Sequence, residues 1–126
     1  MPNGPTFLPG GESFLLADSP RGVIYEVLAS SPAERRVFAQ VEGGSPDGIH
    51  VDGEGHVWNA VWGGSRVDVY DRSGALLHSI EVPASQPTSV LVHDGFVYVT
   101  SATADLSTPN EFDGHTLVAP LADVLA

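Results

Sequence analysis

The feature of this sequence that most constrains its fold is a repeat of about 40 residues. Three short runs rich in β-forming residues each follow a glycine-containing turn, and their central residues, Leu16, Trp58 and Tyr98, are 42 and 40 residues apart. Such runs between turn residues indicate strands. A period near 40 with several strands per unit is typical of β-propeller blades, since helical repeats of this length would show a 3.6-residue apolar period.

Each repeat divides into short strands separated by turns. The predicted strands are 5–8, 13–18, 22–27 and 36–41 in the first unit, 48–52, 56–61, 66–70 and 76–82 in the second, and 89–92, 96–101 and 116–120 in the third. Residues 71–74 form a strong hairpin turn. Residues 102–114 are predicted to be an exposed loop, and 121–126 either replace the last strand with a short helical turn or leave it absent.

We therefore expect an all-β chain that forms half of a β-propeller. A single domain over residues 1–126 would hold three four-stranded blades, at about 3–42, 47–83 and 88–126. Three blades cannot close a ring, and they leave two open apolar flanks. The preferred solution is a homodimer that makes a six-bladed ring; a complementary half-propeller chain, a longer chain of which this is a fragment, and an open arc are the alternatives.

Charge and composition exclude several classes of function. The net charge is −11, and the five basic residues are all arginine, so nucleic acid is not expected as a partner. The acidic surface serves solubility or attracts cations. With no cysteine, disulfides and thiolate sites are excluded. No membrane-spanning run or signal peptide is visible, and the expected location is cytoplasmic.

The candidate chemical residues lie at the starts of the inner strands. These starts read Asn3-Gly4, Asp47-Gly48 and Thr88-Ser89, and equivalent strand ends converge on the central channel of a propeller. Asparagine and aspartate oxygens suit Ca²⁺, Mg²⁺ or Mn²⁺ and tolerate Zn²⁺. The alternative is that Asn-Gly and Asp-Gly are ordinary turns.

Several segments in the same order resemble one known family. They are residues 2–19, which contain Asn3-Gly4 and Asp18-Ser19, residues 45–58, which begin Ser-Pro-Asp-Gly, and then 62–67, 87–89 and 97–102. Together they are similar to the family of gluconolactonase, senescence marker protein and luciferin-regenerating enzyme. The resemblance covers nearly the whole chain and implies a six-bladed propeller with one divalent metal at the channel mouth.

The resemblance also implies roles for two residues. Asn3 and Asp47 match two of the family's metal ligands, and Asp47 would help to activate the attacking water. The family's third ligand, a glutamate, belongs to the N-terminal half that this sequence lacks. The expected cofactor is Ca²⁺, with Zn²⁺, Mg²⁺ or Mn²⁺ as alternatives. The implied function is a metal-dependent hydrolase of sugar lactones or similar small cyclic esters; the alternative is a non-catalytic truncated propeller that serves as a binding or assembly module.

Four further residues are candidates for the substrate pocket. Thr88 and Ser89 start the third inner strand, and a turn-capping role is the alternative. Trp62 precedes two glycines near the expected channel mouth, and the favoured alternative is a tryptophan that packs in the interior. His50 alternates with apolar residues and either faces the channel or is a hydrogen-bonded strand histidine. No Gly-x-Ser-x-Gly motif supports a serine hydrolase.

Overall fold

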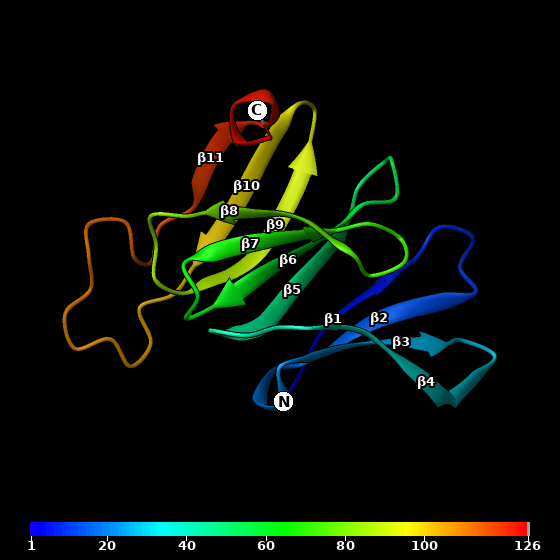
Figure 1. The fold of residues 1–126 in the computed structure, drawn as a ribbon. Helices are drawn as coiled ribbons and strands as arrows, with labels where there is room; N and C mark the ends of the chain where they lie inside the picture. Colours follow the sequence, from blue (N-terminus) through cyan, green and yellow to red (C-terminus); the bar gives the residue numbers. More distant parts are fainter. Residues whose placement is uncertain (126) are drawn as a thin grey trace.

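The computed structural model describes residues 1–125 as three antiparallel β-sheets, followed by a helical turn (Figure 1). The first sheet contains β1 (Pro2–Phe7), β2 (Ser13–Asp18), β3 (Val23–Leu28) and β4 (Ser31–Gln40). The second contains β5 (Ser45–Val51), β6 (Val57–Trp62), β7 (Arg66–Tyr70) and β8 (Leu76–Glu81). The third contains β9 (Pro87–His93), β10 (Phe96–Ser101) and β11 (Leu117–Pro120).

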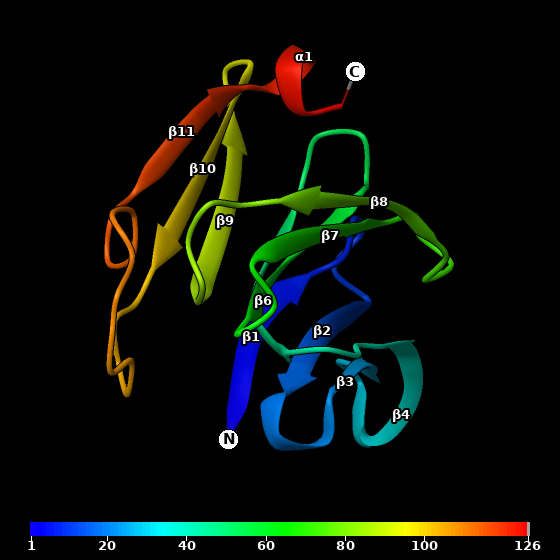
Figure 2. The same cartoon turned by 60° about the vertical axis from the view of Figure 1, so that its left-hand side comes forward.

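The three sheets are arranged as neighbouring blades of a propeller. Strand β5 packs between β1 and β9, so the first strands of the three sheets lie side by side. Each sheet then runs outward in chain order, and the two views show the sheets fanning out from these inner strands (Figures 1 and 2). The all-β partial propeller expected from the repeat is confirmed.

The third sheet differs from the expected four strands. It has three strands, and the chain continues into the short helix α1 (Leu121–Val124). Leu121 and Val124 are three residues apart, which places them on one side of a helical turn, and both pack against the core beside this sheet. The prediction of a fourth strand here is wrong and the helical alternative is confirmed for Leu121–Val124; Ala126 lies outside the described residues.

Two apolar clusters hold the sheets together. Between the first and second sheets, Phe38 meets Tyr70 edge to face with ring centroids 5.9 Å apart. Between the second and third sheets lies Trp58, which is 1 % exposed and donates its indole N–H to Asp52 at 2.9 Å. Val97 and Val99 pack in the same cluster. The alternation of strand residues thus places one face of each sheet against its neighbour.

The predicted loop between the last two strands is present and is tied to the rest of the chain. Residues 102–116 connect β10 to β11, and Asp113 accepts bonds from the Ser85 backbone N–H at 2.7 Å and its hydroxyl at 3.2 Å. Across the described residues, no helix is long and apolar enough to cross a membrane.

Candidate functional site

Asn3-Gly4 and Asp47-Gly48 lie inside strands and not in turns. They fall within β1 and β5, and the pairing of each strand with its neighbour shifts register there, between Asn3 and Thr6 and between Pro46 and Ile49. A bulge of this kind changes the direction of nearby side chains at the end of a sheet. The ordinary-turn alternative is therefore wrong for both pairs.

Gly48 is required because two inner strands approach closely. A Cβ atom at this position would lie 2.8 Å from the Ser89 Cα atom and 2.6 Å from its hydroxyl oxygen. Any side chain would push β9 away from β5 at the level of Asp47. The glycine after Asp47 thus serves the packing of the inner strands.

Asn3 and Asp47 line the same hollow. It has a volume of about 300 Å³ and lies between the first two sheets, where β1 and β5 begin. The lining residues are Met1, Asn3, Ser19, Pro20, Ser45, Asp47 and Trp62. Trp62 is partly exposed, so its ring contributes to the wall of this hollow.

Ser19 links the two halves of the hollow by two short hydrogen bonds. The Asn3 Nδ2 amide donates to Ser19 Oγ at 2.7 Å, and Ser19 Oγ donates to the Pro46 carbonyl at 2.6 Å. The chain therefore fixes Asn3 relative to the residue that precedes Asp47. Because the Asn3 amide nitrogen is used in this way, its Oδ1 oxygen remains as the atom that can bind a cation.

Asp47 is a partly buried carboxylate with no ion pair to any described residue. Burial raises the pKa of Asp47 because desolvation disfavours the charged form, and a bond from the Gly48 backbone N–H opposes this rise. A neighbouring cation would replace part of the lost solvation.

Asn59 was not among the residues singled out in the sequence. Its side chain is fully buried, and Nδ2 donates to the Asp47 and Gly48 carbonyl oxygens, each at 3.3 Å. Its Oδ1 atom is buried without a partner. The sequence contains one signal for Asn59, because it is the one amide in the apolar run Val57–Trp62. Burial of a polar side chain in such a strand costs free energy unless the side chain forms hydrogen bonds.

The oxygen atoms of Asn3 and Asp47 suit a divalent cation in kind but are too few to hold one alone. Both are hard ligands, the type that Ca²⁺ and Mg²⁺ take, but Ca²⁺ usually has six to eight oxygens. Within residues 1–125 no group of three or more histidine, aspartate or glutamate side chains could hold a metal. The described chain thus supplies part of a coordination shell.

The other predicted pocket residues do not line this hollow. Thr88 and Thr100 share a hydrogen bond of 2.7 Å between their hydroxyl oxygens, and Ser89 packs on Gly48. His50 is partly buried with Nε2 unpartnered; burial lowers its pKa, while Asp52 and the Val92 backbone act in the opposite direction. Their role in a substrate pocket stays a prediction.

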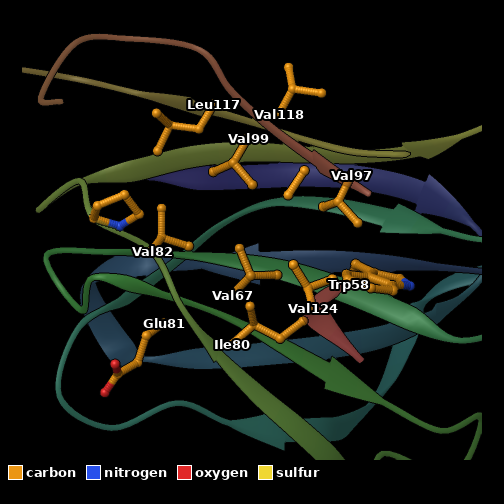
Figure 3. Close-up of a pocket in the computed structure, with 12 residues that line it drawn as sticks. Trp58, Val67, Ile80, Glu81, Val82, Val97, Val99, Leu117, Val118 and Val124 are labelled. Atoms are coloured by element: carbon orange, nitrogen blue, oxygen red, sulfur yellow. The ribbon is translucent and has the colours of Figure 1, made fainter. Parts of the chain in front are cut away.

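A second cavity lies between the second and third sheets (Figure 3). It has a volume of about 240 Å³, and its walls are mainly valine, isoleucine and leucine side chains with Trp58 at one end. Among the described residues that line it, Glu81 alone has an ionisable side chain. Without a pair of polar groups this cavity cannot polarise a carbonyl, so the hollow with Asn3 and Asp47 is the better candidate.

Comparison with known families identifies the chain. Residues 1–103 match the model of the SMP-30/Gluconolactonase/LRE-like region. The chain belongs to this family. Its curated relatives include the pentonolactonase XacC of Haloferax volcanii, 35 % identical over 114 residues, which are 83 % of this chain and 39 % of the relative. The L-arabinolactonase of Azospirillum brasilense is 36 % identical over 110 residues, which are 80 % of this chain and 36 % of the relative.

Solved structures of SMP-30/gluconolactonase-like proteins confirm the fold. The calcium-binding protein regucalcin from Agrobacterium tumefaciens superposes with a TM-score of 0.80 at 29 % identity, over 94 % of this chain and 45 % of that one. A luciferin-regenerating enzyme gives 0.80 at 27 % identity, over 94 % and 44 %. The chain thus spans less than half the length of these relatives.

Proposed function

We propose that this chain forms part of a lactonase-type hydrolase that opens sugar lactones or similar small cyclic esters. The observation that carries the proposal is that Asn3 and Asp47, on adjacent inner strands, line one hollow. The relatives named as pentonolactonase and arabinolactonase support the substrate class.

The hollow offers groups for each part of ester hydrolysis. A divalent metal bound through Asn3 and Asp47 would polarise the lactone carbonyl. As the oxygen of the attacking water bonds to the carbonyl carbon, Asp47 accepts a proton from that water. The proton then passes to the ring oxygen when the ring C–O bond breaks. The product is the open-chain hydroxy acid. Ser19 and Asn59 hold the two ligand-bearing segments in position.

Ca²⁺ is the proposed metal, with Zn²⁺, Mg²⁺ and Mn²⁺ as alternatives. Support for Ca²⁺ comes from the amide and carboxylate ligands and from the structural neighbour described as a calcium-binding protein. The remaining ligands would come from three further blades. A second copy of the chain or a complementary half-propeller would supply them.

A non-catalytic role as a binding or assembly module is the second candidate. It is favoured by the small number of metal ligands in the described part of the chain. In that case the hollow would bind a cation weakly, and it would not turn over a lactone.

Metal binding and hydrolysis of Asp47→Ala and Asn3→Ala test the proposal. We expect Ca²⁺ to bind the unmodified protein in calorimetry and both variants to lose metal and lactone hydrolysis together. Glu111→Ala, at an exposed loop residue, is the control and should behave as the unmodified protein. A metal-loaded, assembled protein that opens no lactone in a broad panel would contradict the hydrolase and leave the binding module.

A further inference from the structure

Trp62 supplies the large aromatic surface of the hollow, and the fold does not use its polar atom. It ends β6 and pairs with Ser45, the first residue of β5. No hydrogen bond links its indole N–H to another described residue, whereas the N–H of Trp58 donates to Asp52. Exposed indole surface beside Asn3 and Asp47 is available to a ligand.

The backbone of Trp62 is held in place by close contact between two glycine-containing loops. A Cβ atom on Gly44 would lie 2.8 Å from the Trp62 carbonyl oxygen and 2.9 Å from the Gly64 nitrogen. Arg66 reinforces the contact, because its guanidinium donates to the Glu42 carbonyl in the neighbouring loop. The ring therefore projects from a fixed point of the hollow.

We infer that Trp62 contacts the substrate and that its indole face supports the ring of a neutral sugar lactone, whose carbonyl is turned toward Asn3 and Asp47. This inference rests on the proposed function and names its specificity residue. A sugar ring carries C–H groups on its faces beside its hydroxyls, and an aromatic ring covers such groups well because it combines a large apolar area with few rotatable bonds.

Charge in the hollow favours a neutral ligand. Its seven lining residues include Asp47 and no arginine or lysine. A phosphorylated sugar would find no arginine or lysine there to pair with its phosphate group, and the net charge of −11 disfavours the approach of an anion. A neutral ring that carries only hydroxyl groups avoids this cost.

Intrinsic fluorescence tests the contact directly, since the chain contains two tryptophans. The probe is a five-carbon sugar lactam, which keeps the ring and the carbonyl but resists hydrolysis, added with Ca²⁺. We expect it to change the emission of the unmodified protein. Trp62→Phe, in which only Trp58 still emits, should lose the change. Trp62→Ala should bind the lactam about tenfold more weakly in calorimetry.

Hydrolysis of a pentonolactone, measured in parallel, separates this inference from the proposed function. For Trp62→Ala we expect KM to rise about tenfold with kcat little changed. The control is Leu77→Ala, which removes an exposed apolar side chain from β8, outside the hollow, and should match the unmodified protein.

The outcomes are distinct. Hydrolysis with an unchanged KM in Trp62→Ala, or an emission change that persists in Trp62→Phe, overturns the inference and leaves the hydrolase standing. An emission change without hydrolysis supports the contact and contradicts the hydrolase. A Trp62→Ala protein whose mass in solution changes while lactam affinity does not assigns Trp62 to assembly and overturns the inference. No response to lactam or lactone in the unmodified protein overturns both proposals.

Discussion

Asn59 is a buried amide in an otherwise apolar strand, and both of its hydrogen bonds go to the segment that carries Asp47. Replacement by leucine keeps the volume and removes both bonds. We expect Asn59→Leu to bind Ca²⁺ about 10- to 100-fold more weakly, which is typical when a group that orients a metal ligand is lost. Calorimetric titration measures the change.

A matched asparagine controls for the loss of an amide. Asn110→Leu also removes a donor to a backbone carbonyl, that of Pro83, but in the loop 102–116. It should leave Ca²⁺ affinity unchanged. Equal affinities for Asn59→Leu and the unmodified protein would show that the bulge holds Asp47 without help from Asn59.

The difference between Asn3 and Asn59 shows what the sequence can predict of the site. Asn3 was predictable because it begins a repeat unit and lies in a segment that resembles a known family. Asn59 and Ser19 act through bonds to residues 12 and 27 positions away, and nothing in their local sequence specifies those partners. Trp62 shows the same limit, since the sequence favoured interior packing, whereas the side chain is partly exposed and lines the hollow.

At the scale of elements, Glu26 on β3 joins the first sheet to the second. Its carboxylate pairs with Arg36 on β4, and Arg72 in the β7–β8 turn donates to its two oxygens at 3.2 and 3.0 Å. Burial raises the pKa of Glu26, but the bonds from Arg72 and Ser13 and the charges of both arginines outweigh it, so the pKa lies below its ordinary value of 4.5.

This lowered pKa predicts a pH-dependent contribution to stability. A carboxyl whose pKa is lower in the folded state stabilises the fold above its unfolded-state pKa and loses that effect as the pH falls through the folded value. We expect Glu26→Gln to lower the free energy of unfolding by about 1–2 kcal/mol at pH 7, since both arginines are partly exposed. Urea unfolding should show that this difference in the free energy of unfolding becomes smaller as the pH falls into the acid range.

Glu34→Gln is the control for Glu26→Gln. Glu34 lies on β4, is exposed, and pairs with no described residue, so its replacement should change stability little at any pH. The difference in the free energy of unfolding between Glu26→Gln and the unmodified protein could also stay constant from pH 7 into acid. That result would show that the charged form of Glu26 does not cause the difference.

The loop 102–116 depends on Asp113 for its position. Asp113 accepts hydrogen bonds from Ser85 and from the Asn110 backbone N–H, the latter at 2.7 Å. These bonds lower the pKa of Asp113, and the bond from the Ser85 backbone N–H has the largest effect. We expect Asp113→Ala to release the loop and to speed cleavage within residues 103–112 by proteinase K several-fold. Glu111→Ala should be cleaved at the unmodified rate; equal rates for both variants would show that other contacts hold the loop.

The strands and the helical end of the last blade were largely predictable, and the bulges were not. The run Phe96–Ser101 has a strong β composition and forms β10 with the predicted bounds. The register shifts at Asn3 and Asp47 depend on how the inner strands pack, as the contact of Gly48 with Ser89 shows. The sequence offered a short helical turn after Pro120 as one alternative, and Leu121 and Val124 pack against the core from that turn.

At the scale of the whole molecule, the two outer sheets each leave an apolar face uncovered. On the first sheet, Phe7 pairs with Phe14 across the strands, and Phe7 is 60 % exposed. On the third sheet, Leu91 and Val118 both pair with Tyr98 and are 47 % and 55 % exposed. In a propeller, neighbouring blades cover such faces. These faces support our proposal that further blades complete the ring.

If a second copy supplies those blades, its assembly should respond to salt in a defined direction. Each chain carries a net charge of −11, so two copies repel, and added salt screens that repulsion: the screening length falls from about 30 Å at 0.01 M to about 8 Å at 0.15 M. We expect light scattering to give about twice the chain mass of 13.2 kDa, with tighter association at the higher salt concentration.

A charge on the open face of the third sheet separates the second copy from other sources of the missing blades. Val118→Asp places a carboxylate where the partner would pack, so it should shift the mass toward that of one chain. Leu77→Asp adds the same charge on β8 of the middle sheet, which faces neither open flank, and should leave the mass unchanged. A monomer at both salt concentrations, with a mass unaffected by Val118→Asp, would contradict the homodimer. The missing blades would then have to come from a different polypeptide or from a longer chain that contains these residues, and that source would complete the metal site that we propose for Asn3 and Asp47.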